Sequence, residues 1–176
     1  FLSRYFACPD WIIRLWRSAY GPDDTQKLLE MQLRPAPLGL RVNRAKPGAQ
    51  ELFDTLAALP DVQMAAFPGL ALPSGADIAP AGLSLNDALA AGRLSRQSAA
   101  AQYALSRLGM EDWPEPVCDL CAGRGGKTLA LAEAGKRVIA ADIHAGRLSG
   151  LTEELTRLGL PPVPCFRASA ARPPLG

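Results

Sequence analysis

The chain has 176 residues, of which 48% are hydrophobic and 20% are charged, and its formal net charge is +2. This composition predicts a globular protein of one or two small domains and excludes a disordered chain. The nearly neutral charge neither requires nor excludes a nucleic-acid partner, because a local basic patch is enough to bind RNA. No apolar run approaches the roughly 18 residues of a membrane span, so we expect no membrane partner.

The chain begins at Phe1 and shows no basic and apolar leader, which favours a piece of a longer cytoplasmic protein. It contains four cysteines, and two of them fall in or at the ends of segments that read as buried strands. This placement is typical of a reducing compartment, where disulfides are rare.

Residues 1–34 are expected to be helical in two pieces. The first runs from Asp10, a good N-cap residue, to Gly21, and the second covers residues 22–33 before a proline-rich stop. The first piece has a stripe of apolar residues at helical spacing, which we expect to be core: Trp11, Ile12, Leu15, Trp16 and Ala19.

Residues 38–93 have the pattern of a small α/β module. We expect a strand at residues 38–43, a helix at 48–59 and an extended segment at 62–73 that Pro68 and Gly69 interrupt. This order is typical of a ferredoxin-like or RNA-recognition-like arrangement. We therefore expect residues 1–93 to form an N-terminal helical and α/β module that contacts RNA.

Residues 94–176 are expected to begin a second domain. A helix is predicted at residues 95–109 with Ser95 as a possible cap, and a proline-containing linker follows at 111–116. A strand from Val117, a helix from Lys127, a strand at 137–142, a helix at 144–160 and a third strand at 163–169 then alternate. This alternation predicts the first half of a Rossmann-like domain with parallel strands. Such a half sheet would leave an open parallel edge, a further reason to expect an incomplete chain.

The segment DLCAGRGGKT, residues 119–128, joins the first of these strands to its helix. Glycines allow a close backbone approach to a ligand, and a helix N-terminus supplies N–H donors. A Walker A loop would need glycine where Cys121 stands, and a dinucleotide loop would need glycine where Thr128 stands. S-adenosylmethionine carries no phosphate and needs a cation for its carboxylate and an acid for its ribose. Lys127 and Asp142 meet these two needs, so S-adenosylmethionine is the favoured cofactor.

The same segment resembles the D-x-C-A-A-P-G-G-K-T signature of the RNA cytosine-C5 methyltransferases of the Sun/Nop family. The resemblance extends in order through YFACPDWIIRLWRSAYG, RPAPLGLRVNRAK, RLSRQSAAAQYAL and ADIHAGRLSGLTEELTRLGL, and so covers nearly the whole chain. It implies a SAM-dependent methyltransferase that modifies C5 of a cytosine in ribosomal RNA, made accessible by base flipping or by single-stranded presentation. It also implies that the loop contacts the methionine part, Asp142 the ribose, Arg147 the vicinity of the cofactor and Ser169 the adenine. The cofactor-binding residues implied are Cys121, Ala122, Gly123, Arg124, Gly125, Gly126, Lys127, Asp142, Arg147 and Ser169.

The chain departs from the family pattern in three ways. Gly123 and Arg124 replace an Ala-Pro pair, and Ser169 stands where an aspartate is usual, which predicts a looser loop and a weaker adenine contact. The family's Pro-Cys-Ser-Gly block and its second catalytic cysteine are also missing, one of which would attack cytosine C6 while the other would help to release the product. The Pro164-Cys165 pair lies in the third predicted strand, too early to supply the nucleophile, so we expect no catalytic residue within this chain. Two alternatives stay open: a non-catalytic fragment that binds SAM or RNA, and a P-loop-like nucleotide-binding protein.

The remaining polar residues carry weaker expectations. Cys118 and Cys121 form a C-x-x-C pair without further ligands at zinc spacing, so we expect no metal, a buried inert Cys118 and a loop Cys121. His144 is expected to be a solvated residue at a helix start. Six arginines could form an RNA-facing patch or simply a solvated surface: Arg4, Arg14, Arg17, Arg34, Arg41 and Arg44.

Overall fold

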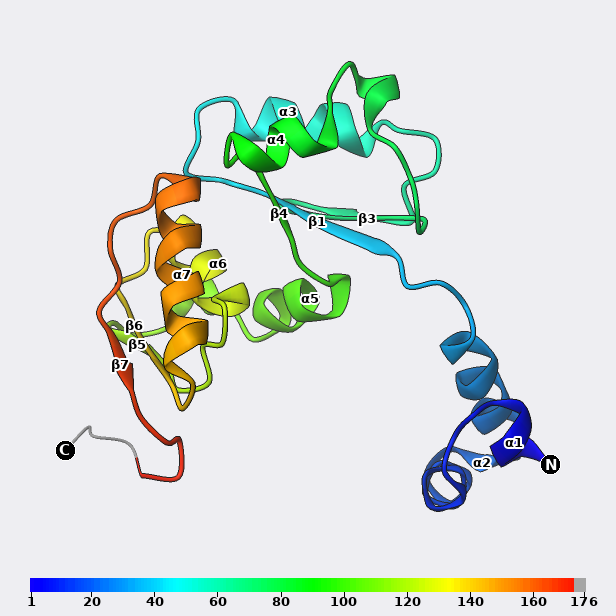
Figure 1. Ribbon diagram of the computed structural model, residues 1–176. Coiled ribbons are helices and arrows are strands. Elements are labelled where there is room, and N and C mark those ends of the chain that lie inside the picture. The colour runs from blue at the N-terminus through cyan, green and yellow to red at the C-terminus, as the bar shows by residue number, and fades with distance from the viewer. Residues whose placement is uncertain (173–176) are drawn as a thin grey trace. The chain divides into compact units, whose positions relative to one another are not determined.

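The computed structural model describes residues 1–172, and these fall into two compact units that divide between Ala36 and Pro37 (Figure 1). Residues 173–176, the end of the predicted second domain, lie outside the described residues. Within the described part, no helix is both long and apolar enough to span a membrane.

The first unit consists of helices α1 (Leu2–Tyr5) and α2 (Asp10–Gln32). Gly21 has non-helical angles (φ 81°, ψ 172°) and precedes Pro22, so α2 bends there into the two pieces that the sequence predicts. The expected core stripe is wrong in part: Ile13 is buried, whereas Trp11 and Leu15 are 62% and 57% exposed. Trp11 and Leu15 stay exposed because a unit this small has only a small core, which includes Phe6.

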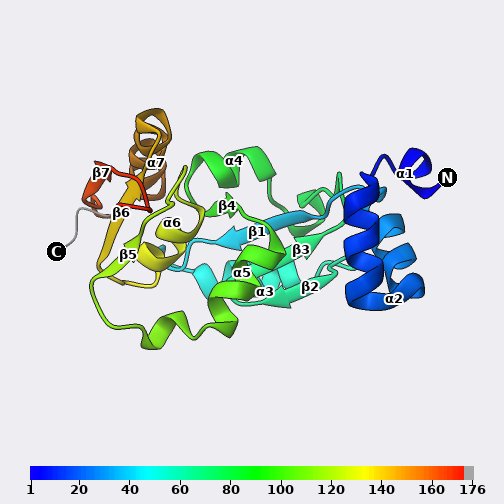
Figure 2. The ribbon, with the colours of Figure 1, turned by 90° about the horizontal axis from the view of Figure 1, so that it is seen from below.

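The second unit contains a four-stranded antiparallel sheet in the order β2-β3-β1-β4. Its strands are β1 (Leu38–Val42), β2 (Met64–Ala66), β3 (Gly69–Leu72) and β4 (Leu94–Arg96). Helices α3 (Ala49–Ala57) and α4 (Leu85–Ala90) cover one face and α5 (Ala99–Arg107) lies on the other, as Figures 1 and 2 show. The core under α3 includes Leu40, Val42, Leu52 and Leu56. Short 3₁₀ turns lie at Ala79–Ala81 and Met110–Asp112.

The predicted helix at residues 95–109 is wrong at its start. Ser95 lies in β4, paired with Arg41, and the helix begins only at Ala99. The N-cap is Ser98, whose side chain accepts a hydrogen bond from the Ala101 N–H at 3.3 Å. The four-stranded sheet thus continues past residue 93, while the division of the chain at that residue stays a prediction.

A second sheet is parallel, in the order β5-β6-β7, with β5 (Val117–Asp119), β6 (Val138–Asp142) and β7 (Cys165–Arg167). Helix α6 (Gly126–Glu133) joins β5 to β6, and α7 (Ala145–Leu158) joins β6 to β7. Because the strands follow one another in chain order, right-handed crossovers place both helices on one face. Leu129 of α6 and Leu151 of α7 meet Ala140 of β6 in the core there. The carboxyl ends of the three strands share one edge, where ligands bind in open α/β sheets.

Candidate functional site: a glycine-rich loop and an acidic strand end

The loop between β5 and α6 is held by the aspartate that ends β5. Asp119 Oδ1 accepts a hydrogen bond from the Cys121 N–H at 3.3 Å, and Asp119 Oδ2 accepts one from Thr128 Oγ1 at 2.7 Å. The Ala122 N–H donates to the Ala141 carbonyl oxygen of β6 at 3.0 Å. Asp119 therefore orients the loop, and the loop is tied to the strand that carries Asp142.

Asp142 ends β6 and also holds the loop. Its Oδ2 accepts from the Gly123 N–H at 2.9 Å, and its Oδ1 accepts from the His144 N–H at 2.8 Å. The pKa of Asp142 is below its ordinary value, chiefly because of the His144 N–H, with further contributions from the Gly123 N–H and the Arg147 charge, while burial opposes the shift. The carboxylate is thus an ionised acceptor at neutral pH, and each oxygen keeps lone pairs for a further donor.

Two glycines of the loop face in different directions. A methyl group on Gly123 (φ +56°) would meet no atom within 4 Å, whereas one on Gly125 (φ +96°) would overlap Leu151 Cδ1 and lie 3.0 Å from Leu129 Cγ. Gly125 therefore lets α6 pack closely on α7, and Gly123 leaves an open approach beside the Asp142 carboxylate. This open approach and the acceptor next to it are compatible with a bound ribose.

Three of the other predicted cofactor residues lie in the segments that follow the three parallel strands. Lys127 is exposed in the first turn of α6, and Arg147 is exposed in the first turn of α7, close enough to Asp142 to lower its pKa. Ser169 lies in a turn just after β7, where its Oγ accepts from the Ala171 N–H at 3.3 Å. Its neighbour Ala168 donates its N–H to the Asp142 carbonyl oxygen at 3.1 Å, so Ser169 lies at the same edge as Asp142.

The side chain of Arg124, within the glycine loop, lies near Gly150 of α7. Its guanidinium lies against α7, where a methyl group on Gly150 would be 2.9 Å from Arg124 Cζ. The same side chain borders a cavity of about 410 Å³ whose lining includes Arg96 and Arg157. Of the first two loop residues, Ala122 is buried and Cys121 is exposed.

The expectation that Cys118 is buried is wrong, since both thiols of the C-x-x-C pair are exposed. Cys118 lies on β5, which is an edge strand of the described sheet, so no neighbouring strand helps to cover it. Residues 1–172 hold no cluster of three or more His, Cys, Asp or Glu side chains that could bind a metal ion.

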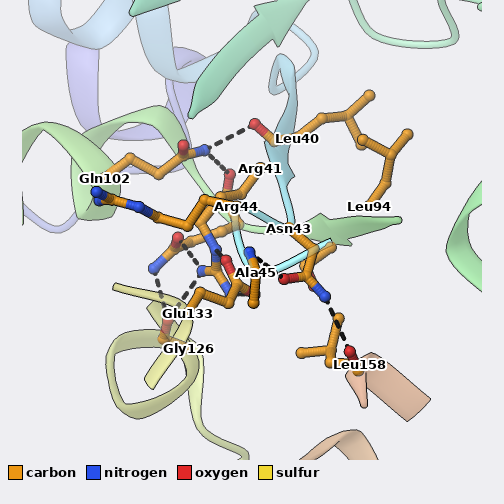
Figure 3. A network of polar contacts seen from close by, with 12 residues as sticks. Leu40, Arg41, Asn43, Arg44, Ala45, Leu94, Gln102, Gly126, Glu133 and Leu158 are labelled. Atoms are coloured by element: carbon orange, nitrogen blue, oxygen red, sulfur yellow. Dashed lines mark hydrogen bonds and ion pairs between the residues drawn. The ribbon is translucent and has the colours of Figure 1, made fainter. Parts of the chain in front are cut away.

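Sequence reasoning missed a buried polar network behind the loop (Figure 3). Arg41 donates from Nε and Nη2 to the Glu133 carboxylate at 2.8 and 2.9 Å, and from Nη1 to the Gly126 carbonyl oxygen at 3.1 Å. Both expectations for Arg41, an RNA-facing patch and a solvated surface, are therefore wrong: its side chain is 3% exposed and that of Glu133 is 0% exposed. Burial raises the pKa of Glu133, and the hydrogen bonds from Arg41 oppose this shift.

The only sequence signal for this network is the alternation of polar and apolar residues along β1. Asn43, two residues after Arg41, is fully buried, and its Nδ2 donates to the Gly92 and Leu158 carbonyl oxygens at 2.9 and 3.0 Å. A polar residue at every second position predicts a polar face of a strand, but not that this face is buried.

Comparison with known proteins finds that the chain is similar to ribosomal RNA methyltransferases over part of their length. Residues 8–87 match the family model described as Methyltr_RsmF/B-like, ferredoxin-like domain. Ribosomal RNA small subunit methyltransferase B of Escherichia coli is 32% identical over 155 residues, which are 86% of this chain and 35% of that protein. The protein of the same name from Citrobacter koseri is 32% identical over 158 residues, 88% of this chain and 36% of that one. The chain thus spans little more than a third of the length of these relatives.

Two solved structures from Pyrococcus horikoshii share the fold. A methyltransferase homolog protein superimposes with a TM-score of 0.74 at 24% identity, over 96% of this chain and 55% of that one. NSun6 superimposes with a TM-score of 0.72 at 18% identity, over 92% of this chain and 66% of that one. The predicted fold, a ferredoxin-like module followed by the first half of a Rossmann-like methyltransferase domain, is confirmed.

Proposed function

We propose that this chain, which is homologous to the N-terminal portion of the Sun-family ribosomal RNA small subunit methyltransferases, carries the cofactor site of an RNA cytosine-C5 methyltransferase. The methyl donor is S-adenosylmethionine and the substrate is ribosomal RNA, in an enzyme that acts in the cytoplasm during rRNA processing. The groups that perform the attack on the base lie in the part of such an enzyme that this chain does not include.

The observation that carries the proposal is the hydrogen bond between Asp142 and the glycine loop. The loop and the acid meet at the carboxyl edge of a parallel sheet, and the Gly123 N–H donates to Asp142 Oδ2 at 2.9 Å. Asp142 would accept the ribose hydroxyls with its remaining lone pairs, and the open side of Gly123 would let the ligand approach the backbone. When bound, S-adenosylmethionine would supply the methyl group.

The rest of the predicted set surrounds this centre. Residues 119–127 would hold the methionine part, with the exposed Lys127 ammonium facing its carboxylate. Arg147 would contribute positive charge beside the ribose, and Ser169 would contact the adenine from the turn after β7. The NSun6 structure of Pyrococcus horikoshii was determined with SFG, an S-adenosylmethionine analogue, which supports the choice of cofactor.

The test is cofactor affinity in the full-length protein. Asp142→Ala should weaken the binding of S-adenosylhomocysteine more than tenfold by isothermal titration, because a charged acceptor of the ribose is removed. Asp61→Ala removes an exposed carboxylate from a loop of the other sheet and should leave the affinity unchanged. An unchanged affinity in Asp142→Ala would refute the ribose assignment. Transfer of a labelled methyl group to ribosomal RNA then separates the enzyme from a protein that only binds.

A further inference from the structure

The four-stranded sheet has one apolar face and one polar face. Leu40 and Val42 point into the core with α3, while Arg41 and Asn43 alternate with them and lie on the opposite face. On that face the backbone of Gly39 lies close to the backbone of Gln97, since a methyl group on Gly39 would overlap the Gln97 carbonyl oxygen. The strand therefore presents a guanidinium to the elements that pack there, among them α6.

The guanidinium of Arg41 reaches both ends of α6. The helix runs from Gly126 to Glu133, a separation of about two turns, so these residues lie on the same face of the helix. Arg41 donates to the Gly126 carbonyl oxygen at 3.1 Å and to both carboxylate oxygens of Glu133. A cation is unfavourable near a helix N-terminus, and an anion is unfavourable near a helix C-terminus. The buried charges of Arg41 and Glu133 are therefore tolerated only as a pair.

Gln97 reinforces the contact with the loop. Its Nε2 donates to the same Gly126 carbonyl oxygen at 2.8 Å, and its Oε1 accepts from Arg41 Nη1. Gly126 follows directly on the glycine loop, whose opposite side is held by Asp142 through the Gly123 N–H. The loop is thus fixed from two sides, by its own sheet and by the preceding module.

We propose that Arg41 and Gln97 are positioning residues for the cofactor loop, which they hold through the Gly126 carbonyl oxygen while Glu133 balances the charge. The N-terminal module then sets the cofactor affinity of the Rossmann-like half without touching the cofactor. This proposal rests on the proposed cofactor site. Its physical basis is that a loop held in its binding conformation loses less conformational entropy when the ligand binds.

The test removes the contact without leaving a buried charge. Arg41→Met combined with Glu133→Leu replaces the ion pair by apolar side chains of similar size, a change that buried pairs often tolerate. Gln97→Met is a second variant that keeps the pair and removes one donor to Gly126. The control is Arg44→Met with Glu111→Met, because this pair (2.6 Å) links the turn that follows β1 to a later segment but does not touch the loop.

Two quantities are measured in the full-length protein: the dissociation constant of S-adenosylhomocysteine and the hydrogen exchange of backbone amides 123–127 in the absence of ligand. In a double variant with an unchanged melting temperature, we expect about tenfold weaker binding and faster exchange at these amides, as for the loss of a well-placed hydrogen bond. Gln97→Met should show the same changes to a smaller extent, and the control should show neither.

Binding and exchange equal to wild type in a folded double variant, or in Gln97→Met if the double variant does not fold, would overturn the proposal. Should the wild type itself bind no S-adenosylhomocysteine, the proposed cofactor site fails. The exchange rates, which require no cofactor, still decide whether Arg41 and Gln97 hold the loop.

Discussion

The two glycines of the cofactor loop provide a matched pair of substitutions. Both Gly123 and Gly125 have positive φ values, +56° and +96°, so alanine is strained at either position. Only at Gly125 does the added methyl group also meet the core, where it would overlap Leu151 and press on Leu129. Gly125→Ala should therefore destabilise the protein more than Gly123→Ala.

The magnitude follows from three contributions. A left-handed backbone costs an L-residue about 1–2 kcal/mol. Alanine restricts the unfolded chain and returns about 0.4–1 kcal/mol of this, which leaves Gly123→Ala destabilised by about 1 kcal/mol. Overpacking adds about 1–3 kcal/mol at Gly125 alone. We therefore expect Gly125→Ala to be about 2 kcal/mol less stable than Gly123→Ala, or roughly 4–8 °C lower in melting temperature for a chain of this size.

Urea unfolding followed by circular dichroism measures the difference, together with thermal melts of the same samples. The slope of the free energy of unfolding against urea concentration should be the same in both variants, so that midpoints compare stability directly. Equal losses of stability in the two variants, or a larger loss in Gly123→Ala, would refute the assignment of Gly125 to packing and of Gly123 to the open side of the loop.

Two further predictions concern thiol reactivity and pH. Under native conditions an alkylating reagent should modify Cys118 and Cys121 first, because both are exposed. Cys165 should react more slowly, because burial raises its pKa. Mass mapping that finds Cys165 modified first would contradict this order. The pKa of Asp142 is lower in the folded protein than its ordinary value of 3.8. The ionised carboxylate therefore contributes fully to loop stability above pH 3.8, and this contribution is lost only as the pH falls through the lower pKa of the folded state. The ratio of S-adenosylhomocysteine affinities between wild type and Asp142→Asn should therefore stay constant from about pH 5 to pH 8, and a ratio that changes within this range would show that the carboxylate titrates there.

Local sequence determined the loop and its surroundings. The order of strand, glycine loop, helix and acidic strand end lies within residues 117–142, and each part has a short-range signal in turn chemistry or apolar periodicity. Asp119 and Asp142 could be assigned from their positions at strand ends, because parallel strands in chain order bring those ends to one edge. The two pieces of α2 were likewise predictable from Gly21 and Pro22.

The tertiary structure alone decided which polar residues are buried and what they contact. Arg41 reads from sequence as one of several arginines, and its partner Glu133 lies 92 residues away on a helix that no local pattern connects to β1. Ser95 looks like a helix cap in sequence, but pairing with Arg41 in the sheet draws it into a strand. In both cases the outcome depends on long-range pairing. A charge such as Arg41 is buried only where a partner from another element is in place, and Ser95 joins a strand only because β1 lies beside it.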